Sequence, residues 1–509
     1  MTPETMLKRA HQAFQDRMPW EALWDTVYRY IAPERATIFR DKQTPNEIGA
    51  EVFDSEAIDG AERLVNLISS GLIPPWQRWM RIEPGSQIQG PDREDVRLEL
   101  KAVEDALFDT LPETGFYDEM QPMLLDRTVG GTGALVDMSV HGKIRFRCAP
   151  LSSIAIEQNY MGRISAAFYK TNWSLEDIER RFGEDAVPQN LRNQQDPNAR
   201  HKPIHEVYLC SVIEPDDLWR NCYVMGENNG HELAPPTFSR NPKVMVSRWS
   251  RIPGTPYGRG PGMRILSDVR ALNKLKELTL KNAAKAVAGV YTAVSDGVFN
   301  PWTVTFEPGS VIPVSSNNVN EPTIAELPNT ARFDVSQFSM GELRQAIGRA
   351  FMADQFGSLE RTPRSAQEIM ERSRILAHDL GSTIARLQHD VILPVIQVVL
   401  EHLQDMGEIS EEFELDGTLA QPRFVSRLAQ AQMANDEQNL IEYATIVTQF
   451  GEVDPKAGLV LDVHRALRRL GEFKAIHPED MRSDEEIEEL MQQAAEVQAA
   501  AEEEQGGMA

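Results

Sequence analysis

The alternation of apolar and polar residues predicts two helices separated by a small β insert in the middle of the chain, followed by a long third helix. The first helix, residues 263–288, places apolar side chains on one side and basic side chains on the other. Its apolar positions are Ile265, Val269, Leu272, Leu280, Ala283 and Val287. Its basic positions, called the basic stripe below, are Arg270, Lys274, Lys281 and Lys285. The pattern indicates an amphipathic helix whose polar side is cationic.

A change of period between residues 289 and 331 indicates the β insert. Apolar residues alternate there with polar ones, as in a strand with one buried face, and prolines and glycines separate the runs. The alternating apolar residues are Trp302, Val304 and Phe306. The insert contains four acids and no lysine or arginine, which favours a surface for protein partners.

A second helix is predicted from about residue 334 to residue 357, and a loop with two arginines, residues 358–364, follows it. The sequence Ser-Ala-Gln-Glu at 365–368 is a capping box, in which Ser365 accepts from a helical N–H and Glu368 reaches back. A third helix therefore begins there and continues to residue 403. Such a helix would be roughly 55 Å long, with a kink at Pro394, whose nitrogen carries no hydrogen.

The remainder of the chain is predicted to mix helices with short strands. Helices are expected at residues 5–31, with an interruption at Pro19, and at 55–70, 92–111, 123–129, 425–450 and 455–470. Strands are expected between 135 and 222, around a capped helix at 174–182, and at 244–251, before a glycine-rich hinge at 254–262. Trp76 and Trp79 are interpreted as a packed corner, and the acidic tail at 479–504 as a marginal helix that fades into disorder. The fold class indicated is α+β, mainly α.

Length and charge restrict the classes of protein. A chain of 509 residues is too long for one ordinary domain, so several modules are expected. The net charge of -25 argues against a general nucleic-acid binder, because binding to phosphates rewards lysine and arginine. The three cysteines, Cys148, Cys210 and Cys222, are expected to be reduced structural thiols. No apolar run reaches the roughly 20 residues of a membrane span, so a soluble protein without a signal peptide is expected.

The sequence offers no convincing catalytic constellation, metal site or cofactor motif. The pairs His378-Asp379 and His389-Asp390 lie about three helical turns apart, but such pairs are usually solvated neighbours. His201 and His205 are no stronger as ligands. The glycines at 130, 131 and 133 are interpreted as a tight turn into a strand, because the chain contains no phosphate-binding lysine motif. We therefore expect a protein that is not an enzyme and needs no cofactor or metal.

Three sequence motifs carry a resemblance to a known family. The run GAERLVNLISSGLIPPWQRW at 60–79 is the first, and YGRG at 257–260 before the helix DVRALN at 268–273 is the second. The third is RTPRSAQEI at 361–369, which opens the long helix that bends at Pro394. In these motifs and in their order the chain resembles the head-to-tail connector, or portal, proteins of short-tailed bacteriophages. The resemblance covers about residues 5–450.

The resemblance implies a subunit of a closed ring around a channel for duplex DNA. It divides the chain into a wing (1–261), a first stem helix (262–288), a clip (289–331) and a second stem helix (332–356), then a channel loop (357–364), a kinked helix with a linker (365–424), crown helices (425–478) and an acidic tail (479–509). About twelve copies related by rotation would close the ring through heterologous contacts. A conduit must not hold its cargo, so net negative charge with few cations suits this role.

The resemblance also implies candidate site residues. The loop residues Ser358, Arg361 and Arg364 would line the channel and touch DNA phosphates transiently. The basic stripe would face either the bore or the neighbouring subunit, unless it is only the polar side of a surface helix. Anchors for partner proteins on the clip would be Phe299, Trp302, Phe306 and Glu307, although some of these aromatics must fill the insert's own core.

The implied partners are other copies of the chain, the large subunit of the terminase packaging motor, tail adaptor and tail proteins, and capsid and scaffolding proteins. The implied place is the portal vertex of the virion, after assembly in the host bacterial cytoplasm. Two other classes remain open. A nucleotide-dependent DNA-processing enzyme would show hydrolysis, and a peripheral membrane or scaffold module, suggested by the amphipathic basic helix, would bind liposomes.

Overall fold

The computed structural model describes most of the chain, and its residues fall into two compact units. The described residues are 2–36, 48–85, 92–140, 142–188, 191, 204–227, 230–288, 291–293, 317–318, 320–322, 324–326, 333–352, 379–409, 420–425, 440–450, 460–463, 466–467 and 470–471. The first unit comprises Met1–Asn66, Gln121–Asp137 and Arg147–Ser358, and the second comprises Leu67–Met120, Met138–Phe146 and Leu359–Ala509. Each unit is described by itself.

Helices and antiparallel sheets make up both units, which confirms the mixed helix and sheet class. The first unit contains a five-stranded sheet in the order β4-β5-β6-β7-β8. Its strands are β4 (Ile154–Gln158), β5 (Ile164–Ser174), β6 (Ile204–Ile213), β7 (Trp219–Met225) and β8 (Thr237–Ser239). A three-stranded sheet has the order β3-β2-β9, with β3 at Phe146–Ala149, β2 at Thr132–Asp137 and β9 at Val244–Arg248. The glycines before β2 form the predicted turn into a strand.

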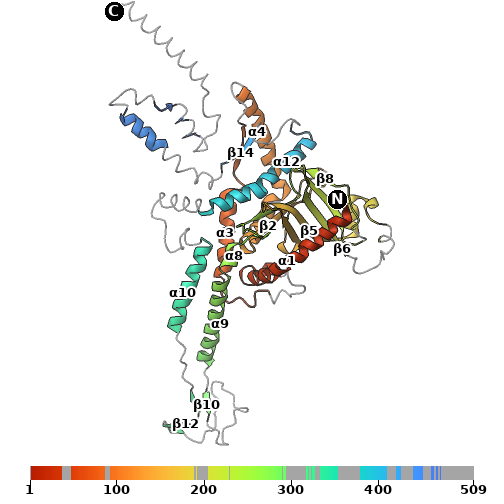
Figure 1. Cartoon of the computed structure of the whole chain (residues 1–509). Coiled ribbons are helices and arrows are strands. Elements are labelled where there is room, and N and C mark those ends of the chain that lie inside the picture. The colour runs from red at the N-terminus through yellow and green to blue at the C-terminus, as the bar shows by residue number, and fades with distance from the viewer. Residues whose placement is uncertain are drawn as a thin grey trace, which may run out of the picture. The chain divides into compact units, whose positions relative to one another are not determined.

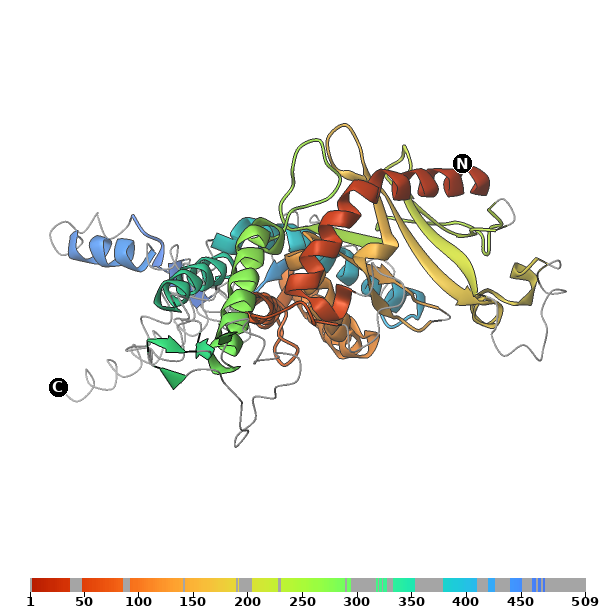
Figure 2. The same cartoon turned by 90° about the horizontal axis from the view of Figure 1, so that it is seen from below.

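The long helix α1 (Pro3–Ile31) packs on one face of the five-stranded sheet (Figure 1). Met6, Leu7 and Ala10 of α1 share one apolar cluster with Phe168 of β5 and Tyr208 of β6. The predicted interruption at Pro19 is wrong, because the helix continues through this residue. Figure 2 shows that α1 changes direction along its length, as expected where a proline removes one helical hydrogen bond.

Short helices complete the first unit. Helix α2 (Pro33–Ala36) follows α1, and α6 (Leu175–Phe182) follows β5. The side chain of Ser174 accepts a hydrogen bond from the Asp177 N–H, so the predicted cap of α6 is confirmed. Helices α3 (Glu56–Leu72) and α5 (Phe116–Val129) lead from one unit to the other along the chain.

The cysteines are buried and form no disulfide among the described residues. Cys210 of β6 and Cys222 of β7 stand opposite each other in register. Its hydrogen bond with Cys222, in which Cys210 keeps the proton, and burial raise the pKa of the Cys210 thiol well above its ordinary value. A thiol held protonated in this way is unreactive, in agreement with the predicted structural role.

Two helices of the first unit lie side by side and are called the paired helices below: α9 (Leu266–Ala288), entered through α8 (Pro261–Arg264), and α10 (Phe333–Ala350) (Figure 1). The apolar positions of α9 divide into two groups. Ile265, Val269 and Leu272 are buried, whereas Leu280 is exposed and Val287 is 90% exposed. The described part of the insert forms two antiparallel pairs, as predicted. Strand β10 (Tyr291–Ala293) pairs with β13 (Ile324–Glu326), and β11 (Asn317–Asn318) pairs with β12 (Glu321–Pro322).

The second unit combines helix α4 (Asp92–Thr110), the turn η2 (Leu111–Thr114) and an antiparallel pair of β1 (Met80–Pro84) with β14 (Ala420–Phe424). Trp79 is buried there, stacks on Phe424 and donates from Nε1 to the Tyr117 hydroxyl at 3.2 Å. Trp76 is 72% exposed, so only one of the two tryptophans forms the predicted packed corner.

The described part of the predicted long helix runs from residue 379 to residue 405. A π-helical turn at Gln388–Ile392 precedes α12 (Leu393–Asp405), and Pro394 stands in the first turn of α12, where its missing N–H is tolerated. By length and composition the segment Asp379–Asp405 passes as a membrane span, contrary to the sequence-based expectation. Most of its apolar window is buried inside the protein, which accounts for this composition.

Candidate functional site: the base of the paired helices

A short segment without helix or strand, residues 51–54, contacts both paired helices near their base and is called the strap below. The side chain of Asn273 on α9 donates from Nδ2 to the carbonyl of Glu51 at 2.6 Å. Its Oδ1 accepts from the N–H of Phe53, also at 2.6 Å. Asn273 is buried, so one amide side chain satisfies two backbone groups of the strap and fixes it to α9.

The strap also binds α10 and the end of α1. Asp54 accepts a hydrogen bond from Nη2 of Arg344 on α10 at 2.6 Å, and its side chain is nearly buried. The hydrogen bond to Asp54 raises the pKa of the Arg344 guanidinium above its ordinary value. Glu51 pairs with Arg29 in the last turn of α1 at 3.4 Å. Three helices are thereby tied to four consecutive residues.

Gly60 allows α3 to lie close to the end of α10. A Cβ atom at this position would come within 2.8 Å of Cδ2 of Phe351, whose side chain is buried. Any larger residue would displace the phenylalanine ring. This contact gives a physical reason for the first residue of the 60–79 motif.

The YGRG motif is a close crossing of two backbones and not the flexible hinge that its glycines predicted. A Cβ at Gly258 would lie 2.4 Å from the Gly131 carbonyl oxygen, and one at Gly260 would lie 2.2 Å from that of Thr128. The Gly258 N–H donates to the hydroxyl of Thr132 at 3.0 Å. Glycines are needed here for close approach, and the chain enters α8 and α9 from a fixed position.

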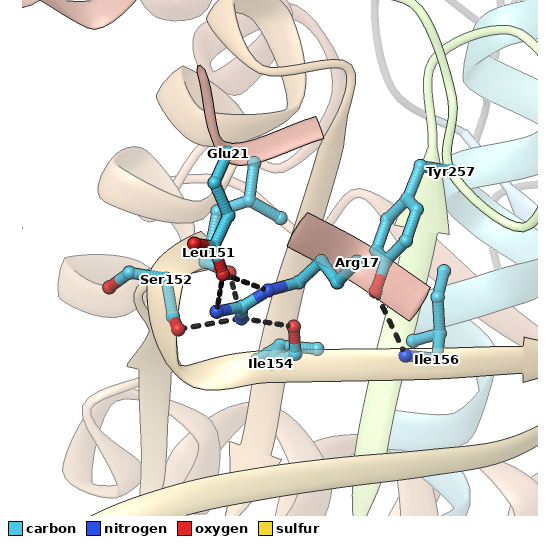
Figure 3. Close-up of polar contacts among 7 residues, drawn as sticks. All are labelled: Arg17, Glu21, Leu151, Ser152, Ile154, Ile156 and Tyr257. Carbon is cyan, nitrogen blue, oxygen red and sulfur yellow. Dashed lines mark hydrogen bonds and ion pairs between the residues drawn. The ribbon is translucent and has the colours of Figure 1, made fainter. Parts of the chain in front are cut away.

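Tyr257, the first residue of that motif, is a buried anchor (Figure 3). Its ring lies 5.6 Å from Trp20 and 5.0 Å from Trp24 of α1, measured between ring centroids. Its hydroxyl accepts from the N–H of Ile156 in β4 at 3.3 Å. Burial raises the pKa of this phenol well above its ordinary value, so it remains a neutral donor and acceptor.

Arg17 of α1 contacts the same region from the helix side. The sequence did not indicate this role, because an arginine on an amphipathic helix is normally exposed. Figure 3 shows its guanidinium among backbone carbonyls. Nη1 donates to the carbonyls of Leu151, Ser152 and Ile154 at 3.3, 2.6 and 2.8 Å, and Nε donates to Glu21 at 3.0 Å. This buried arginine fixes α1 to the start of β4.

The basic stripe is exposed at each of the three positions whose side chains are described, Arg270, Lys274 and Lys281. Lys274 and Lys281 both bind Glu277, at 2.8 and 2.5 Å. These hydrogen bonds lower the pKa of Glu277 to about 2, so it is ionised at neutral pH. Part of the stripe's charge is therefore neutralised on the helix itself. Lys285 lies in α9, but its side chain falls outside the described residues.

The other predicted site residues lie outside the described residues. These are Ser358, Arg361 and Arg364 of the channel loop and Phe299, Trp302, Phe306 and Glu307 of the insert. His378 and His201 lie outside as well. His389 is exposed and pairs with Asp390 at 3.5 Å, and His205 pairs with Glu227 at 3.0 Å. Within the described part of the chain no group of three or more metal-binding side chains occurs.

Comparison of the sequence with known protein families shows which family the chain belongs to. A family model described as bacteriophage head to tail connecting protein matches residues 3–480. The chain belongs to this family. The connector is 20% identical over 531 residues to a probable portal protein of Bordetella phage BPP-1, an alignment that covers 97% of the connector and 92% of the relative.

Among solved structures, a chain from the neck of an empty GTA particle computed with C6 symmetry is similar at a TM-score of 0.33 and 13% identity. This similarity covers 75% of the connector and 85% of that chain. Membership of the family makes the connector a structural component of the virion, associated with other head and tail components. The contacts at the base of the paired helices are joints that hold elements in place, in agreement with such a role.

Proposed function

We propose that the connector is a portal: about twelve copies close into a ring at one capsid vertex and enclose a channel through which duplex DNA is packaged and ejected. The observation that carries this proposal is the pair α9 and α10, which leads into a small β insert and is held at its base by the strap. A stem that must transmit force between two parts of a virion needs such a fixed base. The match of the family along nearly the whole chain supports the same assignment.

The exposed faces of the paired helices support a contact with neighbouring copies. On α10, Phe338 is 69% exposed, and a Cβ at Gly341 would meet nothing within 4 Å. A glycine inside a helix costs about 1 kcal/mol relative to alanine, and nothing in the described chain requires one there. Bare backbone beside an exposed aromatic ring is suited to close approach of another helix. We assign α9 of the adjacent copy to this face, because its exposed Lys274 and Lys281 complement the exposed Glu342.

The remaining segments receive the roles implied by the resemblance. We propose that residues 289–331 form the clip and bind the terminase large subunit and later the tail adaptor and tail proteins, with Phe299, Trp302, Phe306 and Glu307 as anchors. The loop 357–364 would face the DNA through Arg361 and Arg364, and the wing and crown would meet capsid and scaffolding proteins. The net charge of -25 suits a channel that must release its cargo.

Negative-stain imaging of the purified chain tests the central proposal. Rings with a central hole are expected, and a chain that stays monomeric at high concentration would overturn it. Nucleotide hydrolysis would favour the enzyme class, and flotation with liposomes would favour the membrane module.

Arg361→Ala with Arg364→Ala should leave ring assembly intact and alter DNA packaging or retention. Deleting residues 289–331 should abolish motor binding by rings that still form.

A further inference from the structure

The turn between β4 and β5 presents an exposed aromatic side chain on a rigid support. Tyr160 is 96% exposed, and Met161 beside it is exposed as well. The Asn159 side chain accepts from the N–H groups of Met161 and Arg163 at 3.0 and 2.9 Å, and the Gly162 N–H donates to the Asn159 carbonyl at 2.8 Å. The backbone of the turn is therefore held in one conformation before anything binds.

Arg248 at the end of β9 and Arg251 just after it hold the same turn from the side. Arg251 donates to the carbonyl of Met161, and Arg248 donates to that of Gly162 at 3.2 Å. Gly162 has a φ of 71°, which favours glycine, and a Cβ there would displace the Arg251 guanidinium. An ordered turn loses little conformational entropy on binding, which favours a docking function over a merely solvated loop.

The turn is also locally basic in a chain that is strongly acidic. Arg163, Arg251 and Arg259 are exposed around Tyr160, and the backbone of Arg259 is hydrogen-bonded to that of Ser250, next to Arg251. The term tip surface is used below for Tyr160, Met161, Arg163, Arg251 and Arg259. Aromatic residues, methionine and arginine are the types enriched in protein interfaces. The neighbouring β6–β7 turn, by contrast, carries the exposed acids Asp216 and Asp217.

The opposite end of β5 has the complementary character. Ser174 ends the strand, caps α6 and stands in register with Ile204, which is 66% exposed. Exposed acids follow in and after α6 and outnumber the exposed Arg180 between them. The term corner surface is used below for Ile204, Glu176, Glu184 and Asp185. The eleven residues of β5 separate the two surfaces by roughly 33 Å. Figure 2 shows the long strands of this sheet side by side.

We propose that the tip surface of one copy docks on the corner surface of the next copy. This inference rests on the proposed function, because it names one of the contacts that would close the ring. A heterologous contact requires two different, complementary patches that face in different directions, and opposite ends of one strand supply them. Tyr160 and Met161 meet the exposed Ile204, while the arginines meet Glu184 and Asp185 at the rim. Charge of opposite sign at a rim sets the orientation and speeds association.

A charge exchange in the full-length chain tests this contact. Arg163→Glu and Glu184→Lys should each weaken ring assembly about fivefold per contact, as for a surface ion pair, when the ring fraction is measured by mass photometry against protein and NaCl concentration. The two changes combined should restore assembly. Tyr160→Ser should weaken assembly without a change in salt dependence. Arg147→Glu, at an exposed position on β3, is the control and should assemble as the unchanged chain. Thermal melting of each variant verifies that the fold is retained.

The possible outcomes distinguish failure of the proposed contact from failure of the proposed portal function. Normal assembly of both single variants, or failure of the combined variant to recover, would overturn the contact while rings of the unchanged chain still support the portal. If the single variants weaken association and the combined variant restores it, but negative stain shows no closed rings, the contact is supported and the portal proposal is overturned. If Arg163→Glu assembles normally but loses affinity for a 20-base-pair duplex, the tip surface binds nucleic acid and the proposal is wrong.

Discussion

Asp54 and Arg344 are 290 positions apart in the chain, and their side chains meet at 2.6 Å at the base of α10. The pair joins the strap to the second of the paired helices, while Asn273 joins the strap to the first. Four consecutive residues of the strap therefore contact both helices and help to fix their position.

Asp54→Ala is expected to loosen the base of α10. The charged hydrogen bond is worth about 1 to 2 kcal/mol of unfolding free energy, below the range for buried pairs because Arg344 is partly exposed to solvent. Denaturant unfolding measures the loss, and hydrogen exchange should increase in α10. Gln345→Ala, at an exposed position on the same helix, is the matched control. Equal exchange in the two variants would contradict the role of the strap.

Gly60→Ala is expected to destabilise the first unit, because its methyl group would enter the space of the Phe351 ring. Overpacking of this kind costs about 1 to 3 kcal/mol. Adding Phe351→Leu should recover part of the loss, which would identify the ring as the cause.

Gly341→Ala is the opposite case, since the space beside it is open. It should stabilise the monomer by up to about 1 kcal/mol, as measured by thermal unfolding, and a lower stability would be contrary evidence.

Arg17→Met is expected to cost about 3 kcal/mol, because three carbonyl oxygens lose a buried charged donor. Arg17→Lys should recover little of this loss, since one ammonium group cannot serve these carbonyls and Glu21 together. Lys8→Met on the exposed side of α1 serves as the control in thermal unfolding. Full recovery by lysine would show that charge alone is required.

Glu277 gives a prediction for pH. Its folded-state pKa of about 2 lies below the ordinary value of 4.5, so its stabilising effect is present above pH 4.5 and is lost as the pH falls towards 2. The stability advantage of the unchanged chain over Glu277→Gln should therefore decrease on acidification. High salt should reduce it as well, because the partners Lys274 and Lys281 are exposed. Melting curves between pH 6 and pH 2.5 measure this advantage, and an advantage independent of pH would count against the assignment.

The sequence was informative where local chemistry determines the structure. Ser174 has the hydroxyl and the spacing of a helix cap, and its side chain caps α6 as predicted. The same local reasoning placed a break at Pro19, but packing of α1 on the sheet keeps the helix continuous there. A proline inside a helix costs about 3 kcal/mol, and burial of one long apolar face of α1 offsets this cost.

Contacts between distant positions could not be predicted from the sequence. The burial of Arg17 depends on carbonyl groups more than a hundred residues away, and the pairing of Asp54 depends on a helix near residue 344. The glycines of the YGRG motif were interpreted as part of a hinge, whereas Gly258 and Gly260 are required by the closeness of Gly131 and Thr128. Periodicity cannot distinguish these two uses of glycine, because both leave the same pattern.

The pairing of β10 with β13 makes the insert an exchangeable cassette. Ala293 and Ile324 are partners in register, so the chain leaves the paired helices and returns to them at adjacent points. The cost of closing a loop grows slowly with its length. Residues 294–323 can therefore be lengthened, shortened or exchanged while the two ends stay together. If the insert binds partner proteins as proposed, such modularity would allow related connectors to change that partner without altering the paired helices that carry it.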